Sequence, residues 1–318
     1  MLADDSITRN SNTKRPQRPK FPPWIRVAWP SQGAVDGVRD VLEALSLNTV
    51  CRGAQCPNQG ECWSRGTATF MILGNVCSRN CAFCGVTPGQ PAPAEADEPG
   101  RVAEAIRRLG IRHAVITSVT RDDLPDGGAA HFAAVIRAVR DACPGTSIEV
   151  LTPDFGGDAD AISTVANAAP DVFGHNVETV PRLHGLLRDP RASYTRSLNV
   201  LRLARAHLPG NGYVKSGLMA GCGETEAEVL QVLADLRATG CDAVTIGQYL
   251  KPRGGRAEIA EFISPEQFAR YEEHAYALGF RFAMAGPLVR SSYHAEMLLN
   301  DTALRDGGNV SMPPSNLA

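Results

Sequence analysis

The sequence predicts an α/β protein, a partial (β/α)6 barrel of the TIM type with an extension at each end. From residue 69 onward, short apolar segments recur about every 25–45 residues, which leaves room for a helix and two loops between successive strands. The six segments are TFMIL (69–73), AVITSV (114–119), SIEVL (147–151), DVFGHN (171–176), YVKSGLM (213–219) and AVTIGQY (243–249). A closed barrel needs eight such units, so six units favour an open barrel, with a doubly wound open sheet as the alternative.

Helical periodicity fills the intervals between these segments. Thr225 and Glu228 form the pattern of a capping box at the start of one helix, and Gly240 stands where that helix is expected to end. Ser264 and Pro265 predict the start of another helix. Repeated strand–helix units predict a parallel sheet with right-handed crossovers. Apolar residues repeat at helical spacing in two intervals, at Phe132, Val135, Ile136 and Val139 and at Val229, Val232, Leu233 and Leu236.

We expect the chain to divide into four parts. Residues 1–20 are polar and predict a disordered tail. Residues 21–66 form an N-terminal extension that carries three cysteines, and residues 67–262 form the barrel. Residues 263–318 form a C-terminal helix and an extension that contains the sequence RSSY. In a barrel or an open sheet alike, the ligand site lies at the carboxyl ends of the strands.

The composition excludes several classes of protein. The 318 residues carry a net charge of −2, so there is no basic field to hold nucleic acid. The longest apolar runs are too short to span a bilayer, and we expect no membrane partner. Six of the nine cysteines fall between residues 51 and 84, and the polar N-terminus has no export signal. We therefore expect a cytoplasmic protein whose clustered cysteines bind metal, rather than a disulfide scaffold.

One cysteine triplet follows directly on the first predicted strand. Cys77, Cys81 and Cys84 have the spacing C-x3-C-x2-C. Three thiolates can bind three irons of a four-iron cluster and leave the fourth iron open to a small molecule. A zinc site is the alternative, but zinc prefers four ligands, and no Cys or His pair downstream supplies the fourth. The spacing therefore favours a cluster with one open iron.

The other triplet, which is the first along the chain, predicts a second metal site. Cys51, Cys56 and Cys62 have the spacing C-x4-C-x5-C and lie in a segment with glycine and proline, where we expect mostly loops. By itself this spacing is a weaker indication of a cluster than that of the other triplet. Two clusters in one chain suggest one enzyme with two tasks.

The sequence CSRNCAFC, after the first strand of a predicted six-unit barrel, resembles the radical S-adenosylmethionine superfamily. This resemblance implies that the cluster of Cys77, Cys81 and Cys84 binds S-adenosylmethionine on its open iron and cleaves it to a 5′-deoxyadenosyl radical. Phe83 stands where the superfamily has an aromatic residue near the adenine.

Eight further blocks follow one another along the chain: CPNQGECW, GTATFMILG, TSVTRDDLPDGGA, IEVLTPDF, HNVETVPRL, KSGLM, TIGQYL and GPLVRSSYHA. In this order, from about Pro23 to His294, they resemble the lipoyl synthase family. The resemblance implies an enzyme that inserts two sulfur atoms at carbons six and eight of a protein-bound octanoyl group. The implied cofactors are two [4Fe–4S] clusters and S-adenosylmethionine.

The same resemblance implies the ligands of the auxiliary cluster, which serves as the sulfur donor. Cys51, Cys56 and Cys62 are its thiolates, and Ser292, the second serine of RSSY, is its fourth ligand. A serine oxygen is a harder and less well-matched ligand for this iron than a thiolate, so it can leave when the cluster is dismantled. Arg290, beside the serines, is expected to brace the pocket or bind a carboxylate.

Polar residues at the ends of two predicted strands are candidates for contacts to S-adenosylmethionine. Thr117 and Ser118 end the second strand, and Asn176 and Glu178 end the fourth. Capping of the next helix is the alternative role for these residues. Lys215 lies inside the fifth segment, where an unpaired ammonium is costly to bury. We assign it to cofactor binding, with a protein carboxylate as the alternative partner.

The resemblance also implies partners. These are octanoylated carrier domains (of 2-oxoacid dehydrogenase acyltransferase subunits and of the glycine-cleavage carrier protein), a ferredoxin- or flavodoxin-type electron donor, and cluster-assembly proteins. Residues 251–262 depart from the family pattern, which bears on the choice of carrier. One alternative function is a related enzyme that sulfurates another acyl group. Another is a two-cluster protein without catalysis, against which the three-ligand triplet argues.

Overall fold

In the part of the chain that the structure describes, the centre of the fold is an eight-stranded sheet whose strands follow one another in chain order. The computed structural model describes residues 21–25, 32–53, 56, 58–64, 69–293 and 297–299, and the predicted tail lies outside them. The first strand pairs antiparallel with the second, and every later pair is parallel. The strands are β1 (Asn48–Thr49), β2 (Thr69–Ile72), β5 (His113–Ser118), β6 (Ser147–Leu151), β7 (Val172–Gly174), β8 (Tyr213–Ala220), β9 (Ala243–Gln248) and β10 (Phe282–Gly286).

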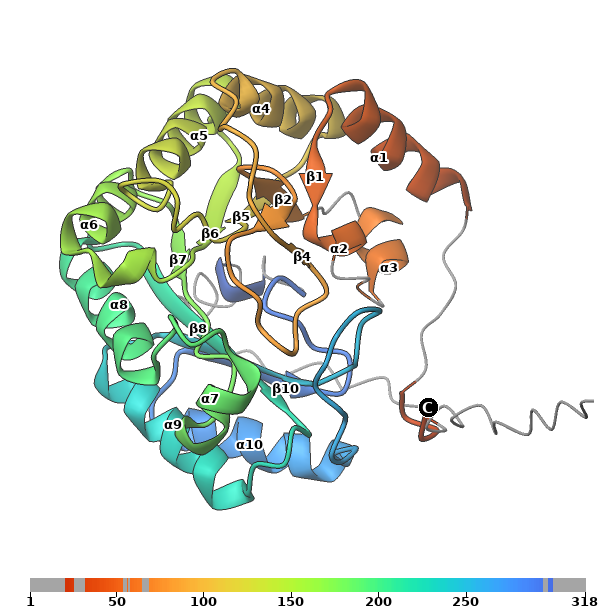
Figure 1. Ribbon diagram of the computed structural model, residues 1–318, viewed down its shortest axis with the longest axis vertical. Helices are drawn as coiled ribbons and strands as arrows, with labels where there is room; N and C mark the ends of the chain where they lie inside the picture. Colours follow the sequence, from red (N-terminus) through yellow and green to blue (C-terminus); the bar gives the residue numbers. More distant parts are fainter. Residues whose placement is uncertain are drawn as a thin grey trace, which may run out of the picture.

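Among the described residues, six helices connect the successive parallel strands and surround the sheet on its outer side (Figure 1). They are α4 (Glu98–Leu109), α5 (Ala129–Ala142), α6 (Ala159–Asn167), α8 (Tyr194–His207), α9 (Glu226–Ala238) and α10 (Pro265–Ala277). The sheet order is linear from β1 to β10. Helices on the outer side of a linear parallel sheet make an open barrel, and the doubly wound alternative, with helices on both faces, does not apply.

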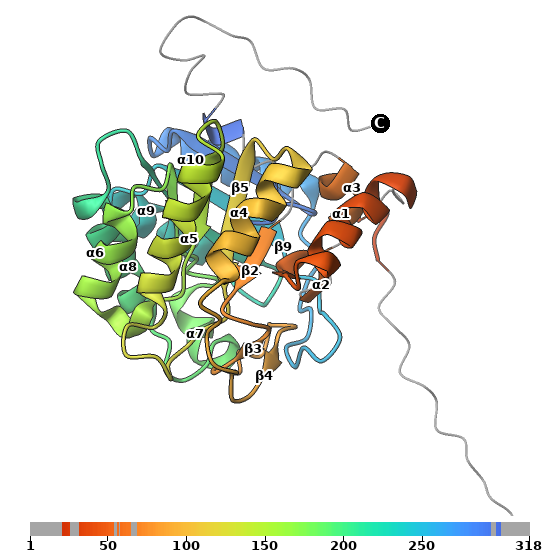
Figure 2. The ribbon, with the colours of Figure 1, turned by 90° about the horizontal axis from the view of Figure 1, so that it is seen from above.

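One end of the barrel carries the loop of the second cysteine triplet. This loop contains a two-stranded parallel sheet, β3 (Val76–Cys77) with β4 (Thr87–Pro88). Figure 2 shows β3, β4 and the short helix α7 (Pro181–Leu187) together at this end. It is the end where the parallel strands finish, as the sequence predicts.

The α/β class and the open barrel are confirmed, and each of the six predicted segments contains a strand. The strand β10 was not predicted. It pairs in parallel with β9, so α10 and β10 continue the sheet beyond residue 262. Its sequence, FAMAG, has no β-branched residue and ends in glycine, which weakens the local signal for a strand.

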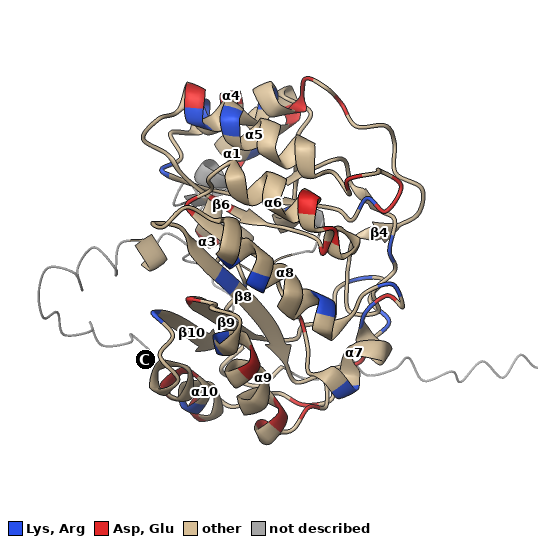
Figure 3. Cartoon of the chain, turned by 90° about the vertical axis from the view of Figure 1, so that its left-hand side faces the viewer, with Lys and Arg blue, Asp and Glu red and all other residues tan. Residues whose placement is uncertain are grey.

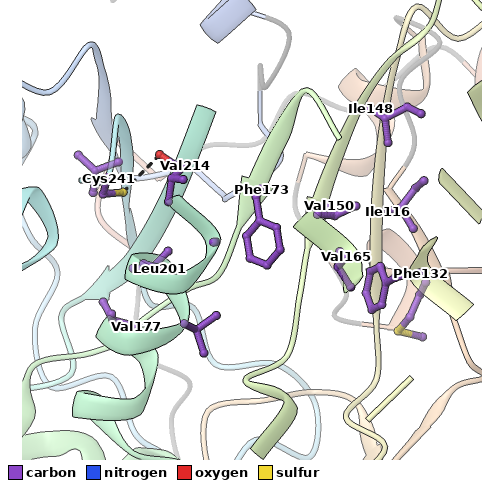
Figure 4. Close-up of a cluster of buried hydrophobic side chains, with 14 of the residues drawn as sticks. Ile116, Phe132, Ile148, Val150, Val165, Phe173, Val177, Leu201, Val214 and Cys241 are labelled. Carbon is purple, nitrogen blue, oxygen red and sulfur yellow. Dashed lines mark hydrogen bonds between the residues drawn. The ribbon is translucent and has the colours of Figure 1, made fainter. Parts of the chain in front are cut away.

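The core lies between the sheet and its helices (Figure 4). Phe132 of α5 packs there with Ile116 and Val150 of the strands, and all three side chains are fully buried. Phe173 and Leu201 extend the same cluster toward α8. The predicted apolar faces of α5 and α9 are buried, which confirms the helical periodicity.

Charged side chains lie mostly on the helices and the loops, and the strands carry few of them (Figure 3). This distribution is the one expected for an α/β sheet covered by amphipathic helices. In the described residues, no helix has the length and apolar character needed to cross a membrane.

The N-terminal extension is more regular than predicted. Helix α1 (Gln32–Ala44) leads to β1, and two short helices, α2 (Val50–Gly53) and α3 (Gln59–Ser64), lie where loops were expected and carry Cys51 and Cys62. Helices this short depend on tertiary contacts. Such contacts are present, because Trp63 is 2% exposed and Cys51 is 7% exposed within the core.

The chain after β10 turns back into the interior of the barrel. In Figure 1 this dark-blue segment lies inside the ring of strands and helices. A side chain at Gly247 would collide with the carbonyl oxygen of Val289, and a Cβ at Gly217 would lie 3.2 Å from Ser291 Oγ. These two glycines therefore make room for the returning segment.

The capping box of α9 gives a test of the fold. Thr225 accepts from the Glu228 N–H, and the Glu228 side chain accepts from the Thr225 N–H, as predicted. We expect Thr225→Ala to lower the free energy of unfolding by about 1 kcal/mol, measured by urea denaturation. Thr225→Ser keeps the cap and should stay near wild type. Equal losses in both variants would contradict the capping role.

Candidate functional site

A cavity at the carboxyl ends of the strands brings the second cysteine triplet together. Cys77, Cys81 and Cys84 all line it, and we call it the cysteine cavity. Its other walls come mainly from the last residues of β5 and β6 and from the residues that follow β5, β6 and β7. The three thiols therefore face the same space as the strand ends where the sequence predicts ligand contacts.

Each thiol of this triplet accepts a hydrogen bond from the backbone. Cys77 and Cys84 accept from the N–H two residues further along the chain, at 3.4 and 3.5 Å. Cys81 accepts from the N–H of Asp189 at 3.3 Å. Hydrogen bonds to cysteine sulfur are typical of iron–sulfur ligands and adjust the potential of the cluster. The donor set thus fits a cluster bound by three thiolates.

Burial changes the pKa of two of these thiols. It raises the pKa of Cys84 to about 11 and also raises the pKa of Cys81, because a thiolate is costly to bury without a cation. Within the described ranges, no three His, Cys, Asp or Glu side chains converge on a point where a single metal ion would bind. A four-iron cluster requires wider spacing than a single ion, since each thiolate binds a different iron.

Arg79, between the first two cysteines of the loop, anchors the loop to the sheet. It is 5% exposed, and its guanidinium donates to Asp154 at 2.7 and 2.9 Å and to Asp122 at 2.8 Å. Asp154 follows β6 and Asp122 follows β5. Bidentate, charge-assisted bonds of this kind fix both distance and orientation. Arg79 therefore sets where the cysteine loop lies relative to the strand ends.

A second cavity adjoins the first, and we call it the central cavity. The two share Phe83, Cys84, Asn176 and Glu178. The lining of the central cavity includes Ser291 of the returning C-terminal segment. Asn176 Nδ2 donates to Ser291 Oγ at 2.7 Å, so a residue at the junction of the cavities is bonded to that segment.

The first triplet lies beside the edge strand β1. Cys51 is on α2, Cys62 is on α3, and Cys56 lies between them with its N–H donating to the Cys51 carbonyl at 3.1 Å. Asn58 Nδ2 donates to the carbonyl of Leu288 at 2.6 Å. The structure thus joins this part of the N-terminal extension to the C-terminal segment.

The RSSY turn brings two further predicted residues to this region. Arg290 lines the central cavity, and burial lowers its pKa, while the Cys56 thiolate acts in the opposite direction. Its charge is thus within electrostatic reach of the first triplet. Ser292 Oγ lies 2.9 Å from Thr69 Oγ1 at the start of β2, the strand that pairs with β1.

The predicted contacts at the strand ends lie in the cavities. Thr117 and Ser118 line the cysteine cavity, and Asn176 and Glu178 line both cavities. The capping alternative does not apply, because the N-caps of α5 and α7 are other residues. In the described structure, the buried hydroxyl of Ser118 has no hydrogen-bond partner. An unsatisfied buried hydroxyl in a cavity wall is a place for a polar ligand atom.

Lys215 is not part of this site, and its assignment to cofactor binding is not supported. Its ammonium donates to Glu149 at 2.9 and 3.1 Å, and His113 Nε2 lies 3.5 Å from the same carboxylate. Lys215 is 3% exposed and lies outside the residues that line the two cavities. The protein carboxylate, the alternative partner in the sequence, satisfies the buried charge.

Three residues of the site were not found from the sequence. Arg79 and Ser291 stand inside recognisable motifs, but only the fold shows what they contact. Arg188 lines the cysteine cavity after α7 and donates to the carbonyls of Asn176 and Val177 at 3.3 and 3.4 Å. No local pattern distinguishes it from the other arginines nearby.

The comparisons with known proteins agree with this geometry. Residues 71–236 match the Radical SAM superfamily. Two solved structures resemble the fold with a TM-score of 0.53. Methylornithine synthase (PylB) is 13% identical, with 83% of this chain and 87% of that chain covered. SuiB of Streptococcus suis, bound to precursor peptide SuiA, is 11% identical, with 68% and 48% covered. The chain is therefore a radical S-adenosylmethionine protein.

Curated relatives narrow this class. Lipoyl synthase of Caldanaerobacter subterraneus subsp. tengcongensis is 55% identical over 279 residues, which cover 88% of this chain and 97% of the relative. Lipoyl synthases of Rubrobacter xylanophilus and Thermus thermophilus are 52% and 50% identical, covering 88% and 89% of this chain and 87% and 88% of theirs. The chain belongs to the lipoyl synthase family.

The corrected role of Lys215 gives a test. We expect Lys215→Met to lower the free energy of unfolding by about 3–5 kcal/mol, because it leaves the Glu149 carboxylate buried without its partner. The double variant Lys215→Met, Glu149→Leu removes both charges and should recover most of the loss, measured by denaturant unfolding. If the double variant is no more stable than Lys215→Met alone, the ion pair is not the cause.

Proposed function

We propose that this chain acts as a lipoyl synthase, which inserts two sulfur atoms at carbons six and eight of an octanoyl group bound to a carrier protein. Family membership supports the reaction. The observation that carries it in the structure is the pair of adjoining cavities. One is lined by the second triplet, the other reaches the RSSY turn, and Phe83, Cys84, Asn176 and Glu178 line both.

The two cysteine triplets divide the work. When bound, the two [4Fe–4S] clusters and S-adenosylmethionine supply a hydrogen-abstracting 5′-deoxyadenosyl radical and the two sulfur atoms. The second triplet holds the cluster that binds S-adenosylmethionine, and the backbone N–H bonds to its sulfurs support this role. The first triplet, with Ser292, holds the auxiliary cluster. The ligands are Cys77, Cys81 and Cys84 for one cluster and Cys51, Cys56, Cys62 and Ser292 for the other.

The wall of the cysteine cavity positions S-adenosylmethionine. Phe83 would flank the adenine, and the hydroxyl of Ser118, which has no partner in the described structure, would offer a hydrogen bond. Glu178 is half-buried and offers a carboxylate to the amine. Thr117 and Asn176 complete this set. Because Thr117, Ser118, Asn176 and Glu178 stand at the ends of strands of one sheet, they would hold the ligand in a fixed orientation.

The octanoyl chain occupies the central cavity. Leu218, Met219 and Leu250 supply an apolar lining, as an acyl chain requires. The same cavity lies between the cysteine cavity and Arg290, so carbons six and eight have access to both sides. Apolar walls also exclude water, which protects a reactive carbon centre.

The carrier domain docks at the mouth of the central cavity, which Pro252 helps to line, and residues 251–262 take part. The N–H groups of Arg256 and Ala257 both donate to the carbonyl of Ala82, at 2.7 and 3.0 Å, so this segment covers the cysteine loop. Octanoylated domains are the substrates. A ferredoxin- or flavodoxin-type protein supplies electrons, cluster-assembly proteins rebuild the auxiliary cluster, and the protein works in the cytoplasm.

The division of labour predicts different losses for the two triplets. We expect Cys77→Ala to abolish formation of 5′-deoxyadenosine from S-adenosylmethionine in the presence of dithionite. Cys56→Ala should retain this cleavage but form no lipoyl product, as measured by mass spectrometry of the octanoylated carrier. Equal loss of cleavage in both folded variants would contradict the assignment. Wild type that cleaves without making a lipoyl product would favour an enzyme for another acyl group.

Metal content tests the number of clusters. Protein reconstituted under anaerobic conditions should hold about eight irons and about eight sulfides per chain. Replacing the three cysteines of either triplet by alanine should lower both values by about half. A value of about four irons in wild type would mean that one triplet binds no cluster.

A further inference from the structure

Two hydroxyl groups that lie 223 positions apart in the sequence meet at the start of β2, the strand that pairs with β1. Thr69 Oγ1 donates to Ser292 Oγ at 2.9 Å. Thr69 is 4% exposed, and Ser292 is half-buried. A hydrogen bond between two side chains in such surroundings exchanges little with water and holds both groups in one geometry.

The sheet fixes the position of Thr69. It begins β2 and pairs in register with Val115 of β5. On the other side of the same strand, Phe70 pairs with Thr49 of β1, which continues into α2 and Cys51. A β-branched side chain on a strand has few χ1 rotamers. Strand β2 therefore carries the Thr69 hydroxyl at a fixed place beside the segment that bears the first cysteine.

The turn around Ser292 is held on both sides. Ser291 Oγ accepts from Asn176 at 2.7 Å, and the Tyr293 hydroxyl donates to Glu61 of α3 at 3.1 Å. Because Ser291 and Tyr293 are bonded to different parts of the fold, the backbone of Ser292 between them has a defined position. Rotation of its own side chain remains, and the bond from β2 restricts that rotation.

We propose that Thr69 is a positioning residue for Ser292: its hydroxyl orients the serine oxygen toward the auxiliary cluster and holds it while the cluster is absent. This inference rests on the proposed function, in which Ser292 is the fourth ligand. A serine oxygen has two lone pairs, so it can accept from Thr69 and bind iron together. Partners of this kind orient metal ligands, and losing one typically lowers metal affinity about 10–100-fold.

The role follows from how such a cluster is used. A ligand that leaves when the cluster is consumed must return when it is rebuilt. Thr69 belongs to the sheet and not to the cluster, so it offers the serine the same partner in both states. The entropic cost of finding the ligand geometry again is then small.

The test compares Thr69→Val, which keeps the shape without the hydroxyl, with Thr69→Ser, which keeps the hydroxyl. In reconstituted full-length protein, we expect Thr69→Val to speed chelator removal of iron from the auxiliary cluster about 10-fold. It should also change the Mössbauer signal of the oxygen-bound iron. Thr69→Ser should restore both. As a matched control, we use Thr146→Val. Thr146 lies in the loop before β6, and its buried hydroxyl donates to the carbonyl of Ile111. Its removal should change neither the chelation rate nor the Mössbauer signal.

Ser292→Ala distinguishes a failure of the ligand role of Ser292 from a failure of the positioning role of Thr69. If it leaves the Mössbauer signal and the chelation rate unchanged, Ser292 is not a ligand, and that part of the proposed function fails. If it changes both while Thr69→Val changes neither, the ligand stands and the role of Thr69 is refuted. A defect of Thr69→Val that Thr69→Ser does not repair would also refute it, because lost packing would then be the cause. Thr69→Ala takes the place of Thr69→Val if the valine variant does not fold.

Discussion

The rest of the structure depends on the sheet remaining open between its edge strands, β1 and β10. A closed barrel of this kind fills its interior with layers of side chains. Here the segment after β10 takes up part of that interior, and glycines at 217 and 247 leave space for its backbone and for Ser291. The wall of the central cavity and the bonds to Asn176 and Thr69 all follow from this return.

Buried charged side chains fix the positions of strands and loops in the barrel. Arg79 connects the cysteine loop to the ends of β5 and β6 through two carboxylates. Lys215 and Glu149 join β8 to β6 inside the barrel. Each pair is largely shielded from water. Burial strengthens the attraction between the two charges, and it also raises the free-energy cost of losing one partner. The end of the barrel that carries the second cysteine triplet is therefore supported by strands and loops that ion pairs hold in place.

Local patterns in the sequence specify what lies on each strand end, and the fold specifies what those ends meet. The six strands, the capping box and the cysteine spacing follow from periodicity and residue type. Asn176 and Glu178 were predicted because they follow a strand, and Phe83 from its place in the superfamily motif; the cavities contain all three. Lys215 was misassigned since its partner, Glu149, lies 66 positions away. The contacts of Ser291 and Ser292 span 115 and 223 positions. At such separation, strand register and turn geometry determine which residues meet, and the local sequence pattern does not.

The bond between Asn58 and Leu288 joins positions 230 apart, which has a consequence for folding. Contacts at such separation carry a large loop-closure cost and form after the local units that they join. Synthesis proceeds from the N-terminus, so both cysteine triplets leave the ribosome well before the RSSY turn exists. The contacts between the N-terminal extension and the RSSY turn are thus completed late, and for much of its synthesis the chain presents six thiols before that turn exists.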